Sequence, residues 1–247
     1  MRIVAKTDIG LQRSENQDNY RAGEQPDGTV WALVCDGMGG AQGGLLAATL
    51  ACDHLEQAFT QNIDTLKTPA AVRKFLFRVT DEANTVIHTR ARQDPAVHGM
   101  GTTMVCVVAR GGLLQIVHVG DSRAYLYAEG ALGRLTKDHS MVQELIEQGT
   151  ITEQEASTHP HKNLITRALG VGANVDVDYG EAQLCEGDIV LLCTDGLTNC
   201  VSDDEIADTL GAVPFDAAAD ALVQKALDAD GLDNITVLLA GALPAED

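Results

Sequence analysis

The sequence predicts an α+β fold: an antiparallel β-sandwich that carries helices on both outer faces. Three observations favour it. Two long helical patterns lie early in the chain, a run of apolar strand patterns joined by short turns follows, and two more helical patterns precede a final strand. Strands joined by short turns pair antiparallel, and two separate groups of helices can cover opposite faces of such strands.

The size and charge of the chain limit its possible functions. The 247 residues are enough to bury a substantial core in one large domain or two small ones. Acidic residues outnumber basic residues 36 to 17, and the formal net charge is −19. This balance argues against binding nucleic acid or an anionic membrane through a broad basic surface. We therefore expect neither among the partners.

The chain shows no signal for export. No apolar run approaches the roughly 20 residues that cross a bilayer, and the first residues lack the apolar core of a signal peptide. The six cysteines are Cys35, Cys52, Cys106, Cys185, Cys193 and Cys200. They have no C-x-x-C spacing, and several of them lie in apolar runs. Reduced core thiols are typical of a reducing compartment, so we expect a cytoplasmic protein.

The N-terminal part contains a conspicuous apolar strand. A first strand is predicted over residues 3–7, and a polar loop without regular periodicity follows over residues 13–19. The next stretch, V-W-A-L-V-C-D-G-M-G-G-A-Q-G-G, covers residues 30–44. Its apolar run predicts a buried strand that delivers the Asp36 carboxylate to the end of a sheet, and its glycines lead into a helical pattern.

Two successive helices are expected to form one outer layer. The first covers residues 45–59, with Leu46, Leu50, Leu55 and Phe59 near one face. The second begins at Pro69 and reaches about residue 92. Its apolar side consists of Val72, Phe75, Leu76, Val79, Ala83, Val86 and Ile87.

Three strands follow, over residues 102–109, 113–119 and 123–128. The short turns between them, R-G-G and G-D-S, predict an antiparallel meander. The second turn contains Asp121, which could lie near the end of the sheet that carries Asp36. Asp is also common in tight turns without any further role, so both interpretations of Asp121 stay open.

The segment over residues 135–170 differs from its surroundings. It contains a short amphipathic helix around residues 141–147, a capping-box start at Thr152 and Glu155, and a polar loop. Such an excursion between two strand-rich halves is typical of a surface flap. Beyond it we expect strands over residues 175–182 and 188–193, helices starting at Ser202 and Asp216, and a strand opened by Asp233.

Several carboxylates are positioned to meet at one rim of the sandwich. Asp36 and Asp195 each end an apolar strand and precede a glycine, whereas Asp233 opens a strand. Crowded carboxylates repel one another unless protons or a cation neutralise them. The possible ligands are all oxygen donors: Asp18, Asp36, the Gly37 carbonyl, Asp195, Asp233 and, as a further candidate, Asp121. Such hard ligands favour Mg²⁺ or Mn²⁺ over zinc.

Each of these features has an ordinary structural explanation when taken alone. A single Asp-Gly is most often a turn, and Arg13, which precedes Asp18 in the same loop, could be a solvated surface residue. The glycine-rich stretch lacks the Gly-Lys-Ser/Thr ending of a P-loop. We expect it to let the backbone approach the metals, and we expect Arg13 to grip a tetrahedral oxyanion with two parallel hydrogen bonds.

Six motifs occur in order along the chain. They are R-S-E-N-Q-D-N (13–19), D-G-M-G-G (36–40), V-G-D-S-R-A-Y-L (119–126), I-T-R-A-L-G (165–170), L-L-C-T-D-G-L (191–197) and D-N-I-T-V (233–237). Together they resemble the metal-dependent protein phosphatase family, the protein phosphatase 2C or PPM type, and most closely its compact bacterial members. The likeness runs from near residue 6 to residue 240, which makes it specific although each motif alone is weak.

The resemblance implies one domain over residues 1–247, with a flap subdomain at about 136–170. It implies a four-layer α-β-β-α sandwich in which helix pairs flank two central antiparallel sheets, with two Mn²⁺ or Mg²⁺ ions in the cleft. Asp36, the Gly37 carbonyl, Asp195 and Asp233 match the metal ligands, and Asp18 matches a supporting acid. Asp121, shared with Asp195, matches a third, weaker site, and Arg13 matches the phosphate-binding arginine.

The resemblance also implies the reaction, hydrolysis of phosphoserine and phosphothreonine in phosphorylated protein substrates. A water that bridges two cations loses its proton near neutral pH and can attack phosphorus directly. None of the cysteines begins a C-x₅-R loop, so a cysteine nucleophile is not expected. By family analogy, a separate Ser/Thr protein kinase opposes the enzyme. The alternative is an inactive phosphoprotein-binding pseudophosphatase, which an interrupted set of ligands would indicate.

One departure from the family pattern bears on the mechanism. Many eukaryotic members have His at the third position of D-G-x-x-G, where it is a candidate general acid, and this chain has Met38. A thioether has no proton to donate, so that role has to pass elsewhere. His161 is a candidate because it is the flap histidine nearest in sequence to I-T-R-A-L-G. It could equally cap a turn or touch the substrate.

Overall fold

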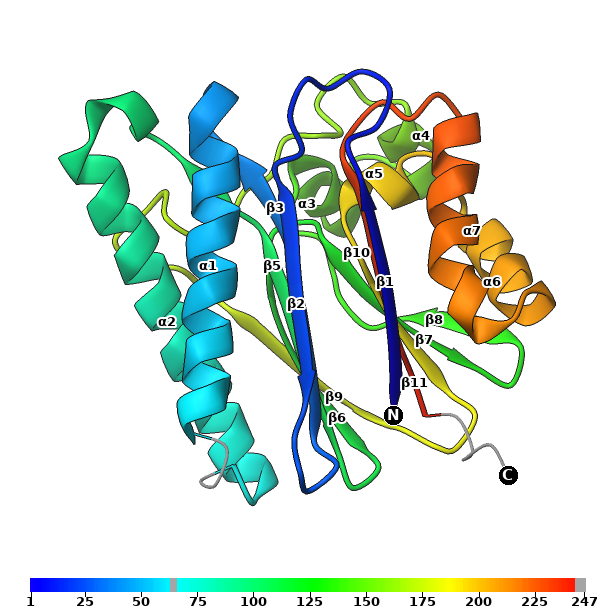
Figure 1. Cartoon of the computed structure of the whole chain (residues 1–247). Helices are drawn as coiled ribbons and strands as arrows, with labels where there is room; N and C mark the ends of the chain where they lie inside the picture. Colours follow the sequence, from blue (N-terminus) through cyan, green and yellow to red (C-terminus); the bar gives the residue numbers. More distant parts are fainter. Residues whose placement is uncertain (63–65, 243–247) are drawn as a thin grey trace.

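The computed structural model describes residues 1–62 and 66–242. Two antiparallel sheets lie face to face at its centre, and helices cover both outer sides (Figure 1). Residues 63–65 and 243–247, which the expected domain of residues 1–247 includes, lie outside the described residues. The domain boundaries stay a prediction.

One sheet has five strands in the order β1-β11-β10-β7-β8. Their bounds are Arg2–Asp8 (β1), Ile235–Gly241 (β11), Ile189–Cys193 (β10), Arg123–Ala128 (β7) and Ala131–Arg134 (β8). The other sheet has six strands, in the order β2-β3-β5-β6-β9 with β4 paired to β3. Their bounds are Asp18–Glu24 (β2), Val30–Met38 (β3), Gly101–Thr102 (β4), Met104–Arg110 (β5), Leu113–Val119 (β6) and Asp178–Gln183 (β9).

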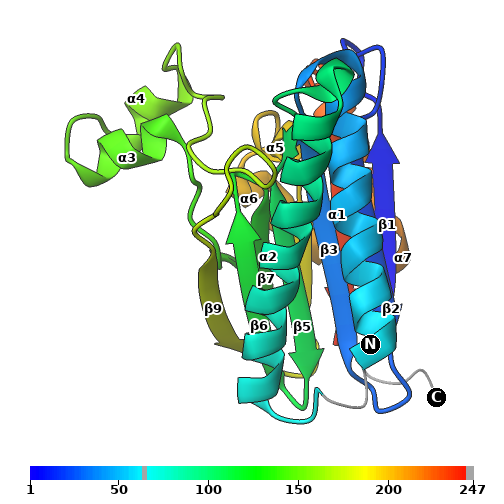
Figure 2. The ribbon, with the colours of Figure 1, turned by 90° about the vertical axis from the view of Figure 1, so that its left-hand side faces the viewer.

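The long helices cover the two outer faces in pairs. Helices α1 (Gly40–Asn62) and α2 (Pro69–Gln93) pack on the six-stranded sheet, and α6 (Asp203–Ala212) and α7 (Phe215–Asp228) pack on the five-stranded sheet. Short helices α3 (Met141–Glu147) and α4 (Glu153–Ser157) lie in the expected flap segment and stand away from the sandwich (Figure 2). The remaining helical turns are η2 (Pro95–Val97) and α5 (Asp195–Thr198).

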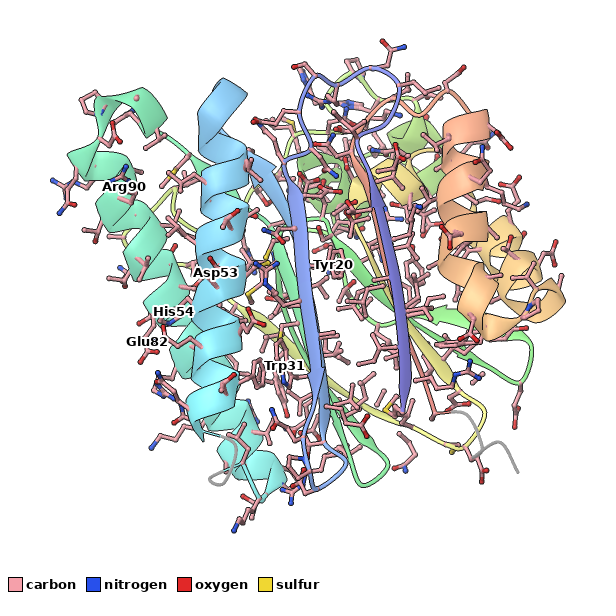
Figure 3. The ribbon with its side chains drawn as sticks, in the orientation of Figure 1. Tyr20, Trp31, Asp53, His54, Glu82 and Arg90 are labelled. Carbon is pink, nitrogen blue, oxygen red and sulfur yellow. The ribbon has the colours of Figure 1, made fainter. Side chains whose placement is uncertain are left out.

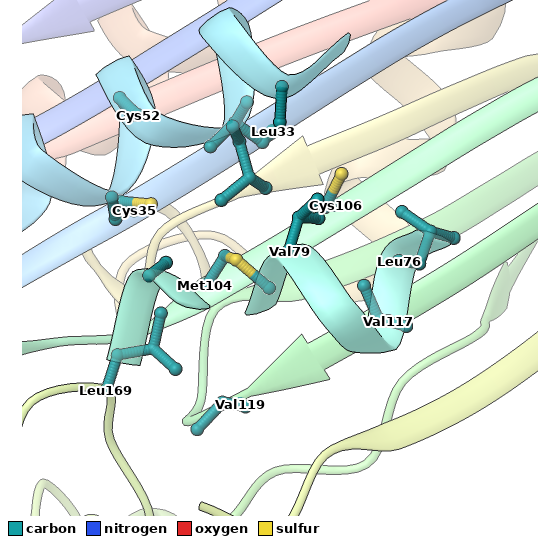
Figure 4. Packing of buried hydrophobic residues seen from close by; sticks show 14 of the residues in the cluster. Leu33, Cys35, Cys52, Leu76, Val79, Met104, Cys106, Val117, Val119 and Leu169 are labelled. Carbon is teal, nitrogen blue, oxygen red and sulfur yellow. The ribbon is translucent and has the colours of Figure 1, made fainter. Parts of the chain in front are cut away.

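Three apolar layers hold these elements together, and β3 shows how. Trp31, Leu33 and Cys35 face α1 and α2, whereas Val30, Ala32 and Val34 face the other sheet. Both faces of β3 are therefore buried, which explains its continuous apolar run. The apolar layer between the six-stranded sheet and helices α1 and α2 is drawn in Figure 4. Trp31 lies beside α1 (Figure 3), and its ring stacks on the ring of Phe59 with 4.6 Å between the centroids. The predicted four-layer α+β sandwich is confirmed.

The meander expected from three successive strands is wrong. Strands β5 and β6 do pair, but the next strand, β7, pairs with β10 and β8 in the other sheet. Residues 120–122 are therefore a crossover between sheets. Strand β7 has apolar residues on both faces, with Ala124 in the layer between the sheets and Tyr125 in the layer beneath α6 and α7. Such a pattern fits either sheet, so the sequence could not distinguish a hairpin from a crossover.

Other boundaries and faces also differ from expectation. Strand β2 was not predicted, since its residues are mostly half-buried and do not alternate between apolar and polar. Helix α1 begins at Gly40 and includes the glycines expected to precede it.

Val86 is exposed, because the buried face of α2 instead includes Thr80, Asn84 and Ala91. Strand β9 starts at Asp178, three residues after its expected start at residue 175.

Candidate active site

A cavity of about 470 Å³ opens at one end of the sandwich. Six residues predicted to form the site line it. Five were predicted through their side chains, and Gly37 through its backbone carbonyl. The six are Arg13, Asp36, Gly37, Asp121, Asp195 and Asp233. Asp36 and Gly37 lie in β3 of the six-stranded sheet, and the other four residues lie outside the strands of the two sheets. Acidic groups far apart in the sequence therefore share one small space.

Asp36 and Gly37 lie near the end of β3, where the backbone is held on two sides. Asp36 N–H donates to Thr103 Oγ1 at 3.0 Å, and Asp36 O accepts from Thr103 N–H at 2.8 Å. A Cβ on Gly37 would lie 2.1 Å from the backbone oxygen of Gly44. Only glycine allows α1 to approach this closely, so the glycine-rich stretch lets two backbone segments pack at the cavity.

Asp195 and Asp233 approach the cavity from β10 and β11, which are antiparallel neighbours. Asp195 begins α5 directly after the strand, and its Oδ2 accepts from Asn199 Nδ2 at 2.9 Å. Asp233 Oδ1 accepts from Asn234 N–H at 2.8 Å. A Cβ on Gly196 would lie 2.0 Å from Asn234 O, so glycine is required for the two loops to pass each other.

Asp18 lies beneath the cavity and does not line it. Its Oδ2 accepts hydrogen bonds from Thr194 Oγ1 and Thr236 Oγ1, both at 2.8 Å. Its Oδ1 is buried and has no hydrogen-bond partner among the described residues. Burial raises the Asp18 pKa to about 7, even though the two threonine bonds act to lower it.

Asp121 reaches the cavity because its segment crosses between the sheets. The crossing is held by the hydroxyls of Thr103 and Ser122, which lie 2.6 Å apart, and Thr103 also binds the backbone of Asp36. Gly120 has a φ of +103°, a conformation that favours glycine. Burial, reinforced by the charges of Asp195 and Asp138, raises the Asp121 pKa to about 8.

The carboxylates of the cavity are electrostatically strained in the absence of a cation. Burial raises the pKa values of Asp36 and Asp195, and neighbouring negative charges add to the effect. Asp195 Oδ1 is buried and, like Asp18 Oδ1, has no hydrogen-bond partner in the described part of the chain. Oxygen-only donors with unsatisfied buried oxygens fit a hard divalent cation. The residues present are therefore suited to Mn²⁺ or Mg²⁺.

Arg13 lies at the rim of this acidic cavity. Its Nη2 is 2.7 Å from Asp233 Oδ2, and this bond raises the pKa of the guanidinium. Its loop is held by Asn234, whose Nδ2 donates to Ile9 O and Glu15 O and whose Oδ1 accepts from Gln17 N–H. The asparagine of D-N-I-T-V thus shapes the loop that carries the arginine.

Comparison with known proteins identifies the family. The model of the family described as Protein phosphatase 2C matches residues 12–233. The chain belongs to this family. The protein phosphatase 2C resemblance inferred from the sequence is confirmed.

Named relatives in the protein phosphatase 2C family match nearly the whole chain. A protein of Listeria welshimeri named serine/threonine phosphatase stp is 38% identical over 240 residues, which cover 97% of this chain and 95% of the relative. Protein phosphatase PhpP of Streptococcus pneumoniae is 37% identical over 241 residues, covering 97% and 96%. The prediction of a serine/threonine phosphatase is confirmed.

Solved structures of the family agree. The serine/threonine phosphatase of S. agalactiae superposes with a TM-score of 0.89 at 36% identity and covers 96% of this chain and 98% of that one. The catalytic domain of the phosphatase PstP, solved with two manganese ions, has a TM-score of 0.84 at 33% identity, covering 96% of each chain. These findings confirm the fold, and the two manganese ions of the PstP structure agree with the metals expected from the sequence.

The structure does not bring His161 to the cavity. It is exposed in the flap segment, where its backbone N–H donates to His159 Nδ1 at 3.2 Å, and the described residues that line the cavity do not include it. Asn163 and Ile165 of the same segment do line it, as does Met38. Asn163 and Ile165 belong to no periodic pattern, so the sequence analysis did not identify them as lining residues.

Other supporting residues were also missed. Thr194, Thr236 and Asn234 all lie within the quoted motifs, and their hydroxyl and amide groups were the available signal. The base of the flap contains a second missed group. There His139 Nδ1 accepts from Gly120 N–H, and Arg167 donates to Asp178 at 2.8 Å. The first contact joins the flap to the crossover that carries Asp121, and the second joins the flap to β9.

Proposed function

We propose that this protein hydrolyses phosphoserine and phosphothreonine in proteins with two Mn²⁺ or Mg²⁺ ions held in the described cavity. In this proposal Asp36, the Gly37 carbonyl, Asp195 and Asp233 are the ligands. Asp18 supports the centre from below, and Asp121 shares a third, weaker site with Asp195. When bound, a pair of divalent cations lowers the pKa of a water and so supplies the nucleophile.

One observation carries the proposal: four carboxylates and an arginine line one cavity, and two buried carboxylate oxygens of the centre have no partner among the described residues. The set is uninterrupted, which argues against an inactive pseudophosphatase. The named relatives and the family support the same reaction class.

The protein's own groups have distinct tasks in this reaction. Arg13 is the cation at the rim, and its N–H groups can bind two phosphoryl oxygens with parallel geometry. Asn234 keeps the arginine loop in place. Met38 can give no proton to the leaving alkoxide. His161 stays a candidate for that role only if the flap moves, and an unchanged pH-rate profile in His161→Ala would exclude it.

The proposal is tested by hydrolysis of a phosphothreonine peptide with Mn²⁺, with Mg²⁺ and with a chelator. We expect activity with a metal and none with the chelator. Asp36→Asn and Asp195→Asn should reduce kcat/KM by more than about 100-fold, the upper end of what loss of a supporting residue costs. Their circular dichroism should remain native. Full activity in chelator, or in either variant, would refute the metal mechanism.

Two finer points belong to the same proposal. We expect a Ser/Thr protein kinase to supply the substrates, since a phosphoprotein phosphatase needs one. We also expect the protein to act in the cytoplasm, because its cysteines are all described and all free, which suits a reducing compartment. Within the described residues, no helix has the length and apolar character needed to span a membrane.

A further inference from the structure

A second hollow, of about 320 Å³, adjoins the catalytic cavity. The two share Met38 and Ile165 as common lining. The hollow's other apolar lining comes from Ala168, Val171 and Val175, in the segment that leads from the flap toward β9. A polypeptide whose phosphorylated residue occupies the cavity can therefore extend over this apolar surface.

The floor of the hollow is fixed to the six-stranded sheet. Leu169 pairs with Thr102 through two backbone hydrogen bonds of 2.9 and 3.1 Å, and β4 pairs in turn with Met38 of β3. A Cβ on Gly101 would lie 2.9 Å from Val171 Cγ2 and 3.1 Å from Met38 Cε. Since Gly101 has no side chain, the valine and the methionine can meet over it and form one apolar surface.

A buried asparagine fixes the loop that carries Val171. Asn84 of α2 is fully buried, and its Oδ1 accepts from Gly170 N–H at 2.7 Å. Its Nδ2 donates to Gly172 O at 3.1 Å and to Ala173 O at 3.3 Å. The amide thus holds the backbone on both sides of Val171, and the loop is ordered before anything binds.

Val171 itself is 55% exposed despite this fixed backbone. An apolar side chain held in one place beside a catalytic cavity loses little conformational entropy when it binds a partner. The charged groups around the hollow disfavour an acidic occupant. Arg167 is engaged by Asp178, and exposed Asp176 repels an acidic side chain.

We propose that this hollow binds an apolar side chain of the phosphorylated polypeptide, at a position close to the phosphorylated residue. The proposal rests on the phosphatase function and names a class of substrate for it: phosphoproteins with an aliphatic residue near the phosphorylated serine or threonine. It also gives Met38 a purpose that histidine would not serve, because a flexible thioether adapts to varied apolar side chains.

The test compares phosphothreonine peptides of Gly and Ser in which one Leu is moved through the three positions on each side. At one position Leu should raise kcat/KM about tenfold over Gly, the scale expected for an apolar contact in a pocket. Asp at that position should give a value below that of Gly. Lys there should give no gain.

The protein variants are Val171→Asp, the milder Val171→Ala, and Val86→Asp as a matched exposed valine on α2 that does not line the hollow. The gain from Leu should disappear in Val171→Asp, decrease in Val171→Ala and persist in Val86→Asp. The ratio of kcat/KM for the Leu peptide to that for p-nitrophenyl phosphate should fall about tenfold in Val171→Asp.

The outcomes are distinguishable. No position-dependent gain from Leu in the unmodified protein, or a gain that survives Val171→Asp, would overturn the docking proposal and leave the phosphatase function intact. A proportional loss of peptide and small-ester hydrolysis in Val171→Asp would also overturn it, because the residue would then support the centre itself. If the unmodified protein with Mn²⁺ cleaved neither substrate, the phosphatase proposal would fail and this one with it.

Discussion

Asp18 Oδ2 accepts a hydrogen bond of 2.8 Å from Thr194 Oγ1, although Asp18 begins β2 and Thr194 follows β10 of the other sheet. In the β2–β3 register Asp18 is paired with Asp36. One buried carboxylate therefore links the two sheets directly beneath the cavity. Its position depends on a hydroxyl from a distant part of the chain.

Replacing Thr194 with Val should weaken both the fold and the metal centre. The change keeps the shape but removes a hydrogen bond to a buried carboxylate, a loss of about 1–3 kcal/mol in the free energy of unfolding. We also expect Mn²⁺ affinity to fall about 10- to 100-fold. Urea unfolding and calorimetric titration measure the two effects. Thr60→Val, on the exposed face of α1, is the control, and equal effects in both variants would contradict the prediction.

The metal-free protein should lose stability as the pH rises. Folding raises the pKa of Asp18 to about 7 and of Asp121 to about 8, so the folded state binds more protons than the unfolded state above about pH 4. Stability contributed by the protonated carboxyls is lost between about pH 4 and 8. Melting temperatures in chelator should fall over this range, and Asp121→Asn should reduce the slope. A melting temperature that rises throughout would show that the carboxylates are not strained.

Saturating Mn²⁺ should change this pH dependence. A divalent cation binds the ionised carboxylates and competes with protons, so metal stabilises the protein more at pH 8 than at pH 5. The increase in melting temperature on adding Mn²⁺ measures the effect. An equal increase at both pH values would indicate that the metal binds elsewhere.

Arg13→Lys should behave nearly as Arg13→Ala. A lysine keeps the charge but cannot offer two parallel N–H groups to a phosphoryl group. Loss of charge-assisted hydrogen bonds worth about 1.5–3 kcal/mol corresponds to a decrease in kcat/KM of about 10- to 100-fold. Inhibition by inorganic phosphate should weaken in parallel. Arg92→Lys, at an exposed position on α2, is the matched control. Full activity of Arg13→Lys would exclude the proposed pair of hydrogen bonds from Arg13 to the phosphoryl group.

Gly37→Ala should be severely destabilising, whereas Gly133→Ala should be tolerated. The new methyl at position 37 would meet the Gly44 backbone oxygen at 2.1 Å, so the end of β3 or the first turns of α1 would have to shift. At position 133 the nearest atom is 3.8 Å away. We expect a loss of at least about 3 kcal/mol at position 37, above the usual cost of overpacking. Thermal unfolding compares the two, and a small effect at position 37 would contradict the close approach.

Features set by neighbouring residues were predictable from the sequence. Helix α3 has its expected bounds, the capping box at Thr152 forms as its spacing indicates, and Ser202 caps the start of α6, where a helix was expected to start. Helix α2 begins at Pro69 as expected. Such signals are local, because a cap or a helical face depends on residues within about one turn. Asp36, Asp195 and Asp233 were recognisable for a related reason, because each lies near the end or the start of an apolar strand.

Only the tertiary structure decided how these pieces combine. The sequence by itself determined the fold class, the long helices and which acidic residues are candidates for the site. It left undecided which sheet β7 joins, that β2 exists, and that Asp18 turns toward Thr194 and Thr236. A strand with apolar residues on both faces, such as β7, fits either sheet. A side-chain hydrogen bond between residues far apart in the chain depends on packing that no local pattern encodes.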